Sequence, residues 1–449
     1  MNYNIYAIVG TYLILLCGGG TRLSVFVSFV FNLGFLLTGF FFTQPEVYQV
    51  SWTTPHCVLT LRLIGLTFDL YDGERARREG RQALSREQEE TALEETPSLL
   101  EILSHSFFLG GYFVGPPIAM KKYMQSVSPT YQASLPDSPL LYGFQRLGLG
   151  VLYLLLHLLG SLLLPNDWPA SQHFSSILLV TKLLLLPAWA KFLLAKYLSV
   201  WLMAEGVCVI SGISYTGTRE DGTPDWSGCA NVKLRRLESA SKFHHVVESF
   251  NVLTNHWASV YIYKRLKFLG SRTLSLLLTL IFLAVWHGCH SGYYLAFINE
   301  FLLVKVEREF LSICGRSKKV ERWLESPRLA RLFRLLGWLV VLFFLPLCFI
   351  PFALLTFSKF YPAYAATYFL LYVVFGSWPL IRGLLKWFLF DENVPEENIP
   401  EEDVPEENVP EEYVFKEDVP GENVPNEDVP EENVFNENVP EENVDKKND

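Results

Sequence analysis

LSLLLTLIFLAVWHGCHSGYYLAFINEFLL, residues 274–303, is among the most apolar stretches of the chain and carries two histidines, His287 and His290, near its centre. An apolar segment of this length predicts a membrane-spanning helix. Ionisable side chains are costly in hydrocarbon, so those that occur there usually face a protein interior or a wet cavity and have a function. The stretch therefore predicts a membrane fold with a functional site inside it.

The composition of the whole chain also indicates a membrane protein. Half of the 449 residues are hydrophobic and 15% are aromatic. We predict an all-α fold, a polytopic membrane helical bundle with eight to ten membrane segments. Two shorter apolar segments, 57–70 and 201–211, are expected to be re-entrant or buried against other helices. The predicted spans are 5–17, 23–42, 99–120, 147–164, 177–200, 274–303, 335–357 and 364–385.

The chain divides into two parts of opposite charge: a membrane domain at 1–390 and a tail at 391–449. The tail repeats a five-residue unit such as Val394-Pro395-Glu396-Glu397-Asn398 and carries 23 acidic and 3 basic side chains. Regular proline and dense like charge predict a disordered tail. The net charge of 1–390 is +10, which suits lipid headgroups and phosphorylated ligands, although the positive-inside bias of membrane loops gives the same excess. No nucleic-acid partner is expected.

Charge and the C-terminus give partial evidence on topology. Lys446 and Lys447, near the last residue, resemble a di-lysine retrieval signal, which predicts an endoplasmic reticulum membrane protein with a cytosolic tail. The basic stretch 316–334 predicts a cytosolic loop, and two further spans would return the C-terminus to the same side. The polar segment 72–96 is expected to be a solvent-side loop or surface helix. The histidine helix is basic at both ends, so charge alone does not orient it.

The spacing of the two histidines indicates whether they lie on the same side of a helix. On a continuous helix His287, His290 and Tyr294 fall on one face, which predicts that they share one cavity. Gly288 and Gly292 would let another backbone approach closely.

Hydrogen bonding between packed helices is the alternative for a membrane histidine, and it is the interpretation we favour for the lone His157. A metal site would need more ligands than this pair supplies, and the seven cysteines contain no CxxC pair. No metal site or disulfide framework is therefore predicted.

A polar, aromatic-rich stretch, SFNVLTNHW at 249–257, precedes the histidine helix. The amide of Asn251 could donate to a developing oxyanion while a neutral imidazole accepts a proton. The alternative for Asn251 is a helix N-cap, for which asparagine is well suited.

Two motifs, Phe250-Asn251-x-x-Thr254-x-x-Trp257 and Trp286-His287-Gly288-x-x-x-Gly292-Tyr293, stand in this order in the chain. Together they resemble the signature of the membrane-bound O-acyltransferase (MBOAT) family, and within it the branch that re-acylates lysophospholipids. The likeness runs from about residue 20 to about residue 385. Further matching segments are 52–61, 97–101, 113–116, 205–208 and 268–270.

The resemblance implies a helical fold around a tunnel in which His287 and Asn251 form a catalytic pair. The implied reaction moves a fatty acyl chain from acyl-coenzyme A (acyl-CoA) to the sn-2 hydroxyl of a lysophospholipid. Lysophosphatidylcholine is the first expected acceptor, followed by lysophosphatidylethanolamine and lysophosphatidylserine. No cofactor is expected, since acyl-CoA is a substrate that already carries an activated thioester. The residues expected to line the substrate cavity are His290, Trp286, Tyr294, Thr254 and Trp257.

Four cations before the histidine helix, Lys264, Arg265, Lys267 and Arg272, are candidates for contacts with the phosphates of acyl-CoA. Anchoring at the membrane interface explains them equally well. Cys289 could form an acyl-cysteine intermediate, but on a helix it points away from His287.

Relative to the family, the chain starts within the N-terminal membrane portion, so we expect an N-terminally shortened membrane domain, and the acidic tail is foreign to the family pattern. Two alternatives remain from the sequence. One is a relative that acylates a sterol, diacylglycerol or protein. The other is a catalytically silent membrane protein that keeps its histidines for packing or proton relay.

Overall fold

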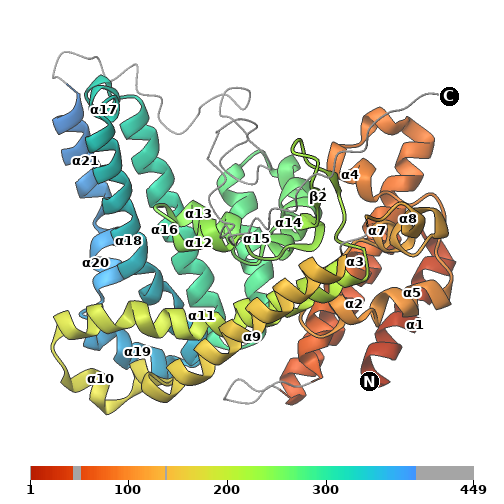
Figure 1. Ribbon diagram of the computed structural model, residues 1–449, viewed down its shortest axis with the longest axis horizontal. Coiled ribbons are helices and arrows are strands. Elements are labelled where there is room, and N and C mark those ends of the chain that lie inside the picture. The colour runs from red at the N-terminus through yellow and green to blue at the C-terminus, as the bar shows by residue number, and fades with distance from the viewer. Residues whose placement is uncertain (1, 44–51, 137–138, 391–449) are drawn as a thin grey trace, which may run out of the picture.

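The computed structural model describes residues 2–43, 52–136 and 139–390. This part of the chain is mostly helical: two groups of helices stand at either end, and a pair of long tilted helices runs between them (Figure 1). The predicted all-α membrane fold is confirmed. The predicted disorder at 391–449, and Lys446 and Lys447 within it, lie outside the described residues.

The N-terminal group surrounds one buried helix, α3. The apolar segment 57–70 lies within α3 and is buried against other helices, which was one of the two predicted alternatives. Asn32 of α2 donates to the hydroxyl of Thr11 in α1 over 2.9 Å, a polar contact that joins two apolar helices. The elements are α1 Asn2–Gly18, α2 Arg22–Thr43, α3 Thr53–Glu79, η1 Arg81–Ala83, α4 Arg86–Thr91, α5 Leu99–Ser106, α6 Leu109–Tyr112, α7 Met120–Ser126 and α8 Pro129–Ala133.

The predicted span 99–120 is wrong, because it is divided among α5, α6 and a loop that leads to α7. The guanidinium of buried Arg62 fills the space where a Cβ on Gly111 would lie. Arg62 donates to the carbonyl oxygens of His105 and Pro116, each over 3.0 Å. A break in the helix here is tolerated because these backbone acceptors are satisfied by protein.

Two long helices, α9 and α11, lie side by side beneath the rest of the molecule (Figure 1). Gly143 of α9 and Gly206 of α11 let the backbones approach, since a Cβ on Gly206 would lie 2.8 Å from the Gly143 oxygen. His157 Nδ1 lies 2.9 Å from the carbonyl oxygen of Phe192 across this pair, which confirms its role in helix packing. The elements are α9 Pro139–Leu163, η2 Trp168–Ala170, α10 Gln172–Ser176 and α11 Leu179–Ile210.

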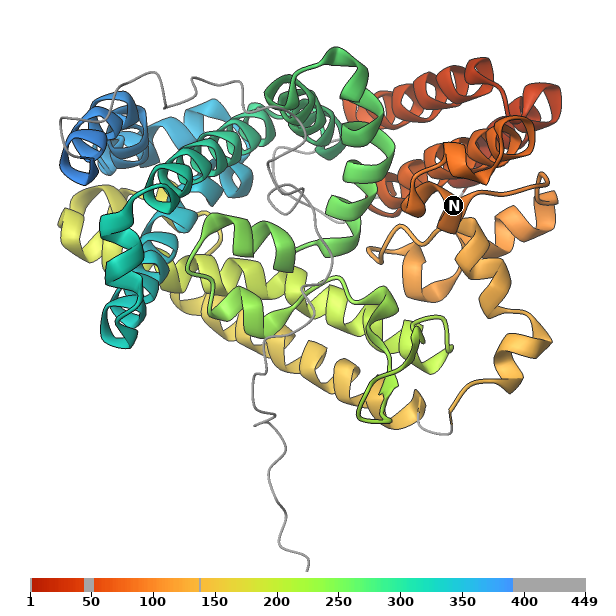
Figure 2. The same ribbon diagram turned by 90° about the horizontal axis from the view of Figure 1, so that it is seen from above.

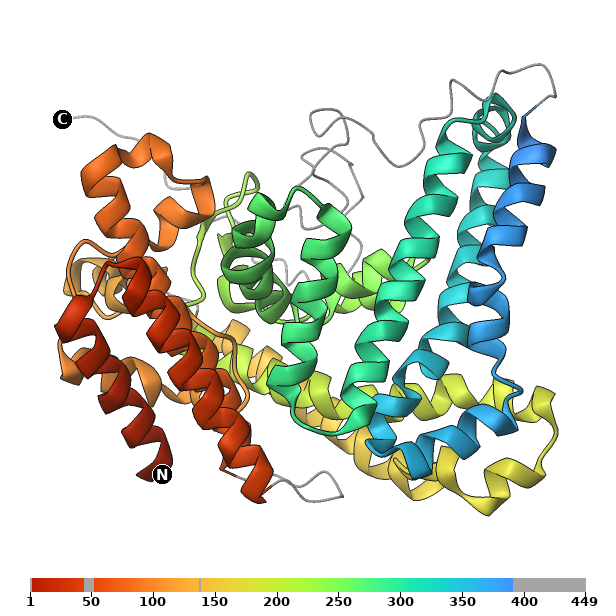
Figure 3. The same ribbon diagram turned by 180° about the vertical axis from the view of Figure 1, so that it is seen from behind.

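Residues 201–210 continue α11 and do not form a re-entrant segment; several of them, such as Leu202 and Cys208, are buried, which is the other predicted alternative. A two-stranded antiparallel hairpin follows, with Gly217 opposite Asp225. Short helices then lead to the centre of the molecule, where α15 stands between the two end groups (Figure 3). The elements are β1 Gly217–Thr218, β2 Pro224–Asp225, η3 Ser227–Cys229, α12 Leu234–Glu238, α13 Phe243–Ser249, α14 Val252–Ala258, η4 Ser259–Tyr263, η5 Lys264–Leu269 and α15 Arg272–His287.

The C-terminal group stands at the opposite side from α1 and α2 when viewed from above (Figure 2). The largest buried apolar cluster joins it to α11. The predicted span 364–385 is wrong, because Tyr368 and Phe369 adopt left-handed conformations with φ of 53° and 52° and divide it between helices. The elements are α16 Ser291–Gly315, α17 Lys318–Leu324, α18 Pro327–Leu354, α19 Phe357–Ala366, α20 Leu370–Gly376 and α21 Trp378–Leu389.

Among the described residues, four helices are long and apolar enough to cross a membrane: α2, α9, α11 and α18. The helices α1 and α15 are apolar but shorter. The protein is therefore a multi-pass membrane protein. The total of eight to ten segments stays a prediction, since several of the apolar segments are divided into shorter helices.

Candidate active site

The stretch 274–303 is not one helix. α15 ends at His287, Gly288 adopts a φ of 137°, and α16 begins at Ser291. The prediction that His287, His290 and Tyr294 share one helical face is therefore wrong, because the chain turns between the two histidines. The left-handed conformation of Gly288 is one that residues with a side chain rarely adopt.

Gly292 lies at the start of α16, just after this break, and packs closely against another backbone. Its N–H donates to the carbonyl oxygen of Leu355 over 2.7 Å, and a Cβ there would lie 2.1 Å from the Pro351 oxygen. The predicted close approach of another backbone is thus confirmed for Gly292, and the partner is the end of α18.

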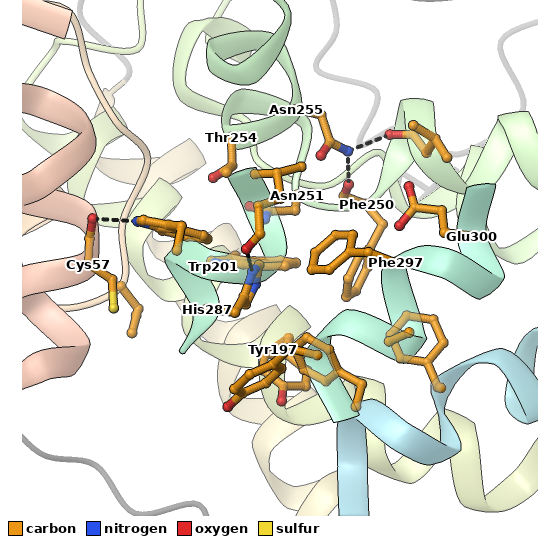
Figure 4. A pocket seen from close by; sticks show the side chains of 18 of the residues that line it. Cys57, Tyr197, Trp201, Phe250, Asn251, Thr254, Asn255, His287, Phe297 and Glu300 are labelled. Atoms are coloured by element: carbon orange, nitrogen blue, oxygen red, sulfur yellow. Dashed lines mark hydrogen bonds between the residues drawn. The ribbon is translucent and has the colours of Figure 1, made fainter. Parts of the chain in front are cut away.

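His287 opens onto a cavity of about 400 Å³ between the two helical groups. The walls come from α3, α11, α13, α14, α15, α16 and α18, and most lining side chains are apolar or aromatic (Figure 4). A mostly apolar cavity with few polar groups is typical of a small-molecule or lipid site. In the part of the chain that the structure describes, no group of three His, Cys, Asp or Glu side chains could hold a metal ion.

The hydrogen bonding of His287 determines which nitrogen can act as a base. Nδ1 lies 2.7 Å from the carbonyl oxygen of Leu283, one turn earlier in α15. Because a carbonyl oxygen only accepts, Nδ1 carries the proton and the lone pair of the neutral ring is on Nε2. The rings of Tyr293, Phe297 and Phe352 pack around the imidazole at centroid distances of 5.2–5.7 Å. The imidazole of His287 is held in an aromatic enclosure.

Asn251 lines the same cavity as His287 (Figure 4). It stands at the N-cap position of α14 with φ 54° and ψ 41°, but its side chain makes no capping hydrogen bond. The alternative of a side-chain N-cap is therefore wrong. An asparagine tolerates this left-handed conformation better than most residues.

Asn231, which the sequence analysis did not identify, holds this region together. Its side-chain oxygen accepts from the Leu253 N–H over 2.9 Å, and its backbone oxygen accepts from the Val252 N–H over 3.0 Å. Its amide nitrogen donates to Asn251 Oδ1 over 3.1 Å. Because Asn251 Oδ1 is occupied in this way, the Asn251 amide nitrogen remains available to donate into the cavity. Asn231 lies in a polar connecting segment with no periodic signal, which is why the sequence did not reveal it.

Replacing Asn231 with aspartate is expected to lower kcat for the reaction at this site by about 10- to 100-fold, because the amide of Asn251, the expected oxyanion donor, loses its orientation. Aspartate still accepts from the Leu253 N–H but cannot donate to Asn251 Oδ1, so the Asn251 amide turns over. The buried aspartate should also lower the temperature of thermal unfolding, so kcat is compared per amount of folded protein. The control is Asn166→Asp, at a half-buried asparagine outside the cavity lining. An unchanged kcat in a folded Asn231→Asp variant would contradict this role.

The other residues expected to line the cavity divide into two groups. Trp286 and Thr254 line it, and Trp286 Nε1 donates to the Cys57 carbonyl oxygen over 2.9 Å. Trp257 is buried behind the wall, stacked on Phe282 at a centroid distance of 5.8 Å. The prediction is wrong for Trp257, His290 and Tyr294, which are not among the described lining residues.

Two of the cations expected at the phosphates of acyl-CoA are paired with acids. Lys264 Nζ lies 2.8 Å from Glu87 Oε1. Burial acts to raise the pKa of Glu87, but the hydrogen bonds from Lys264, from the Glu87 backbone and from Ser85, with the charge of Lys264, together outweigh it, and the pKa falls to about 2. Arg265 donates to both oxygens of Asp72 over 2.8 and 2.5 Å. Lys264 and Arg265 are therefore engaged by acids of this chain, whereas Lys267 and Arg272 are exposed, and contact of the four cations with acyl-CoA phosphates stays a prediction.

Asp72 is fully buried, although the segment 72–96 was expected on the solvent side. Replacing Arg265 with glutamine would leave this carboxylate without its cation, so we expect the free energy of unfolding to fall by about 3–5 kcal/mol. The KM for acyl-CoA of the folded protein should not change. Chemical denaturation and donor titration measure the two quantities, with Arg86→Gln, which breaks the exposed Arg86–Glu90 pair, as the control. A raised KM at unchanged stability would instead support a phosphate contact.

Comparison with known proteins finds sequence similarity over most of the chain. A model of the membrane-bound O-acyltransferase family matches residues 37–318. Lysophospholipid acyltransferase 5 of Drosophila melanogaster is 43% identical over 308 residues, which is 68% of this chain and 61% of the relative. Those of Rattus norvegicus and Homo sapiens are 37% and 36% identical over 84% of this chain and 77% of each relative. The chain belongs to the membrane-bound O-acyltransferase family, on the branch that contains the lysophospholipid acyltransferases.

Proposed function

We propose that the protein is a lysophospholipid O-acyltransferase that moves a fatty acyl chain from acyl-CoA to the sn-2 hydroxyl of a lysophospholipid. Lysophosphatidylcholine is the proposed first acceptor, and lysophosphatidylethanolamine and lysophosphatidylserine are the next. The relatives named lysophospholipid acyltransferase 5 support the reaction class. The apolar cavity supports substrates with long acyl chains.

The proposed reaction needs one base and one oxyanion donor. His287 Nε2 removes the proton from the acceptor hydroxyl while its oxygen attacks the thioester carbonyl carbon. The Asn251 amide donates to the oxygen that becomes negative. The carbon–sulfur bond then breaks, the new ester forms, and the proton passes from the imidazolium to the sulfur of coenzyme A. The thioester is already activated, so the proposal includes no cofactor.

One observation carries this proposal: the Nδ1–H of His287 is fixed on the Leu283 carbonyl, 2.7 Å away, in a cavity that Asn251 also lines. This arrangement leaves Nε2 as the proton acceptor. The aromatic and apolar walls also limit the access of water, which would otherwise hydrolyse the thioester.

We also propose an endoplasmic reticulum membrane location with a cytosolic tail that presents Lys446 and Lys447 to the retrieval machinery. The role of the protein would then be phospholipid remodelling. Replacing both lysines with serine and following the protein by microscopy tests the signal, since a functional signal predicts escape to later compartments.

Purified full-length protein tests the reaction when it is given labelled acyl-CoA with equal amounts of lysophosphatidylcholine, a sterol and a diacylglycerol. We expect label in phosphatidylcholine, at the sn-2 position. Label in the sterol ester or triacylglycerol alone would support a different acceptor, and no product with any acceptor would support a silent protein.

A further inference from the structure

One face of α16 forms a wall of the cavity and carries a single acid. Of the described residues that line the cavity, Glu300 is the one with a carboxyl group. The reaction proposed above does not use it. The lining residues of α16 recur at helical spacing and are Tyr293, Ala296, Phe297, Glu300, Leu303 and Val304.

Glu300 has no ionic partner within the described parts of the chain, since no cation of those parts lies within 4 Å of its oxygens. Figure 4 shows its side chain extending from α16 toward the cavity, beyond Phe297. A carboxyl group without a partner on the wall of a mostly apolar cavity is costly. A ligand that brings hydrogen-bond donors to this point would remove that cost.

The position of Glu300 along α16 indicates which ligand atoms reach it. The ring of Tyr293 lies 5.7 Å from the His287 ring, between centroids. Glu300 follows seven residues later, roughly 10 Å farther along the helix. In acyl-CoA, the second amide nitrogen of the pantetheine arm is seven covalent bonds from the thioester sulfur, a reach of roughly 8–10 Å.

The direction of α16 agrees with a coenzyme A arm. Beyond Glu300 the charges of α16 balance, since Lys305 and Arg308 stand beside Glu307 and Glu309, but the helix ends at Gly315, directly before the basic stretch 316–334. The phosphates of coenzyme A are attracted to a cluster of positive charge. An arm that starts there and ends at His287 must pass Glu300.

We infer that Glu300 accepts a hydrogen bond from an amide N–H of the pantetheine arm and so selects coenzyme A thioesters as donors. The inference rests on the proposed acyl transfer. Glu300 is therefore a donor-binding residue, whereas His287 and Asn251 act on the reacting atoms. An ammonium headgroup of the acceptor would be the competing ligand for the same carboxylate.

Three acyl donors of decreasing length test this inference with lysophosphatidylcholine as acceptor. Acyl-CoA and S-acyl-pantetheine both carry two amides, whereas S-acyl-N-acetylcysteamine carries only the first. Glu300→Leu should raise the KM for the two longer donors about tenfold or more, since a hydrogen bond to a charged group is lost. The KM for the shortest donor and for lysophosphatidylcholine should not change.

Glu300→Gln keeps a carbonyl oxygen as acceptor and should restore most of the donor affinity. Glu321→Leu removes the same charge from an exposed position on α17 and should behave as wild type. Activity of Glu300→Leu with the shortest donor shows that the variant is folded. If it does not fold, Glu300→Ala, which also removes the acceptor, takes its place in the donor series.

Equal loss with all three donors would overturn the inference, as would a raised KM for lysophosphatidylcholine that is absent with lysophosphatidylglycerol, which lacks an ammonium group. Failure of wild type to acylate any acceptor would instead overturn the proposed function.

Discussion

Replacing His287 with alanine is expected to lower kcat for acyl transfer to lysophosphatidylcholine by about 10² to 10⁴, the contribution of a positioned general base. The Nδ1–H to Leu283 hydrogen bond fixes the ring so that Nε2 accepts the proton. The affinity for acyl-CoA should change little, because the aromatic walls that enclose the ring remain. Steady-state kinetics with labelled acyl-CoA in detergent micelles measure both quantities.

His290→Ala serves as the comparison, because the break at Gly288 separates His290 from the cavity. It should keep activity within about tenfold of wild type. Equal losses in both variants would restore the interpretation of a shared histidine cavity. Full activity in His287→Ala would exclude His287 as the base.

Replacing Gly292 with alanine is expected to destabilise the protein by about 1–3 kcal/mol or more, the usual cost of forcing atoms into a filled space. The new Cβ would lie 2.1 Å from the Pro351 oxygen and 2.7 Å from the Leu355 oxygen, both on the backbone of the α18 end. Neither atom can move without shifting α18. Activity should also fall, because the start of α16 holds Tyr293 against His287.

Thermal unfolding in detergent measures this effect, and Gly383→Ala is the matched control. Gly383 lies within α21 with no atom within 4 Å of its added Cβ, so alanine there should be neutral or stabilise the helix. A Gly292→Ala variant as stable and active as Gly383→Ala would contradict the close approach of α16 to α18.

The sequence predicted the membrane fold and the family because those depend on apolar length and on short motifs. It did not predict where helices break. Gly288 can adopt either a helical or a left-handed conformation, and only its surroundings select the φ of 137°. Similarly, the guanidinium of Arg62 occupies the space where a side chain on Gly111 would lie. Arg62 stands 49 positions earlier, and no local pattern connects the two residues.

The site was predictable only in part for the same reason. His287 and Asn251 stand in recognisable motifs, and the structure brings both to one cavity. Asn231 and Glu300 stand in no motif. The hydrogen bonds of Asn231 and the place of Glu300 on the cavity wall become visible only in the folded chain. The pairing of Arg265 with buried Asp72 was not predictable, because a cation near a membrane helix has the same sequence signal whether it meets a phosphate or a carboxylate of the same chain.

The central claim is that His287 and Asn251 act on one substrate in one cavity. Comparing kcat for acyl transfer to lysophosphatidylcholine in His287→Ala, Asn251→Ala and the double variant tests it most directly. Residues that act as a unit are strongly non-additive, so the double variant should lose no more than about tenfold beyond the worse single variant. Losses in the double variant that multiply, or a single variant that keeps full activity, would contradict the claim.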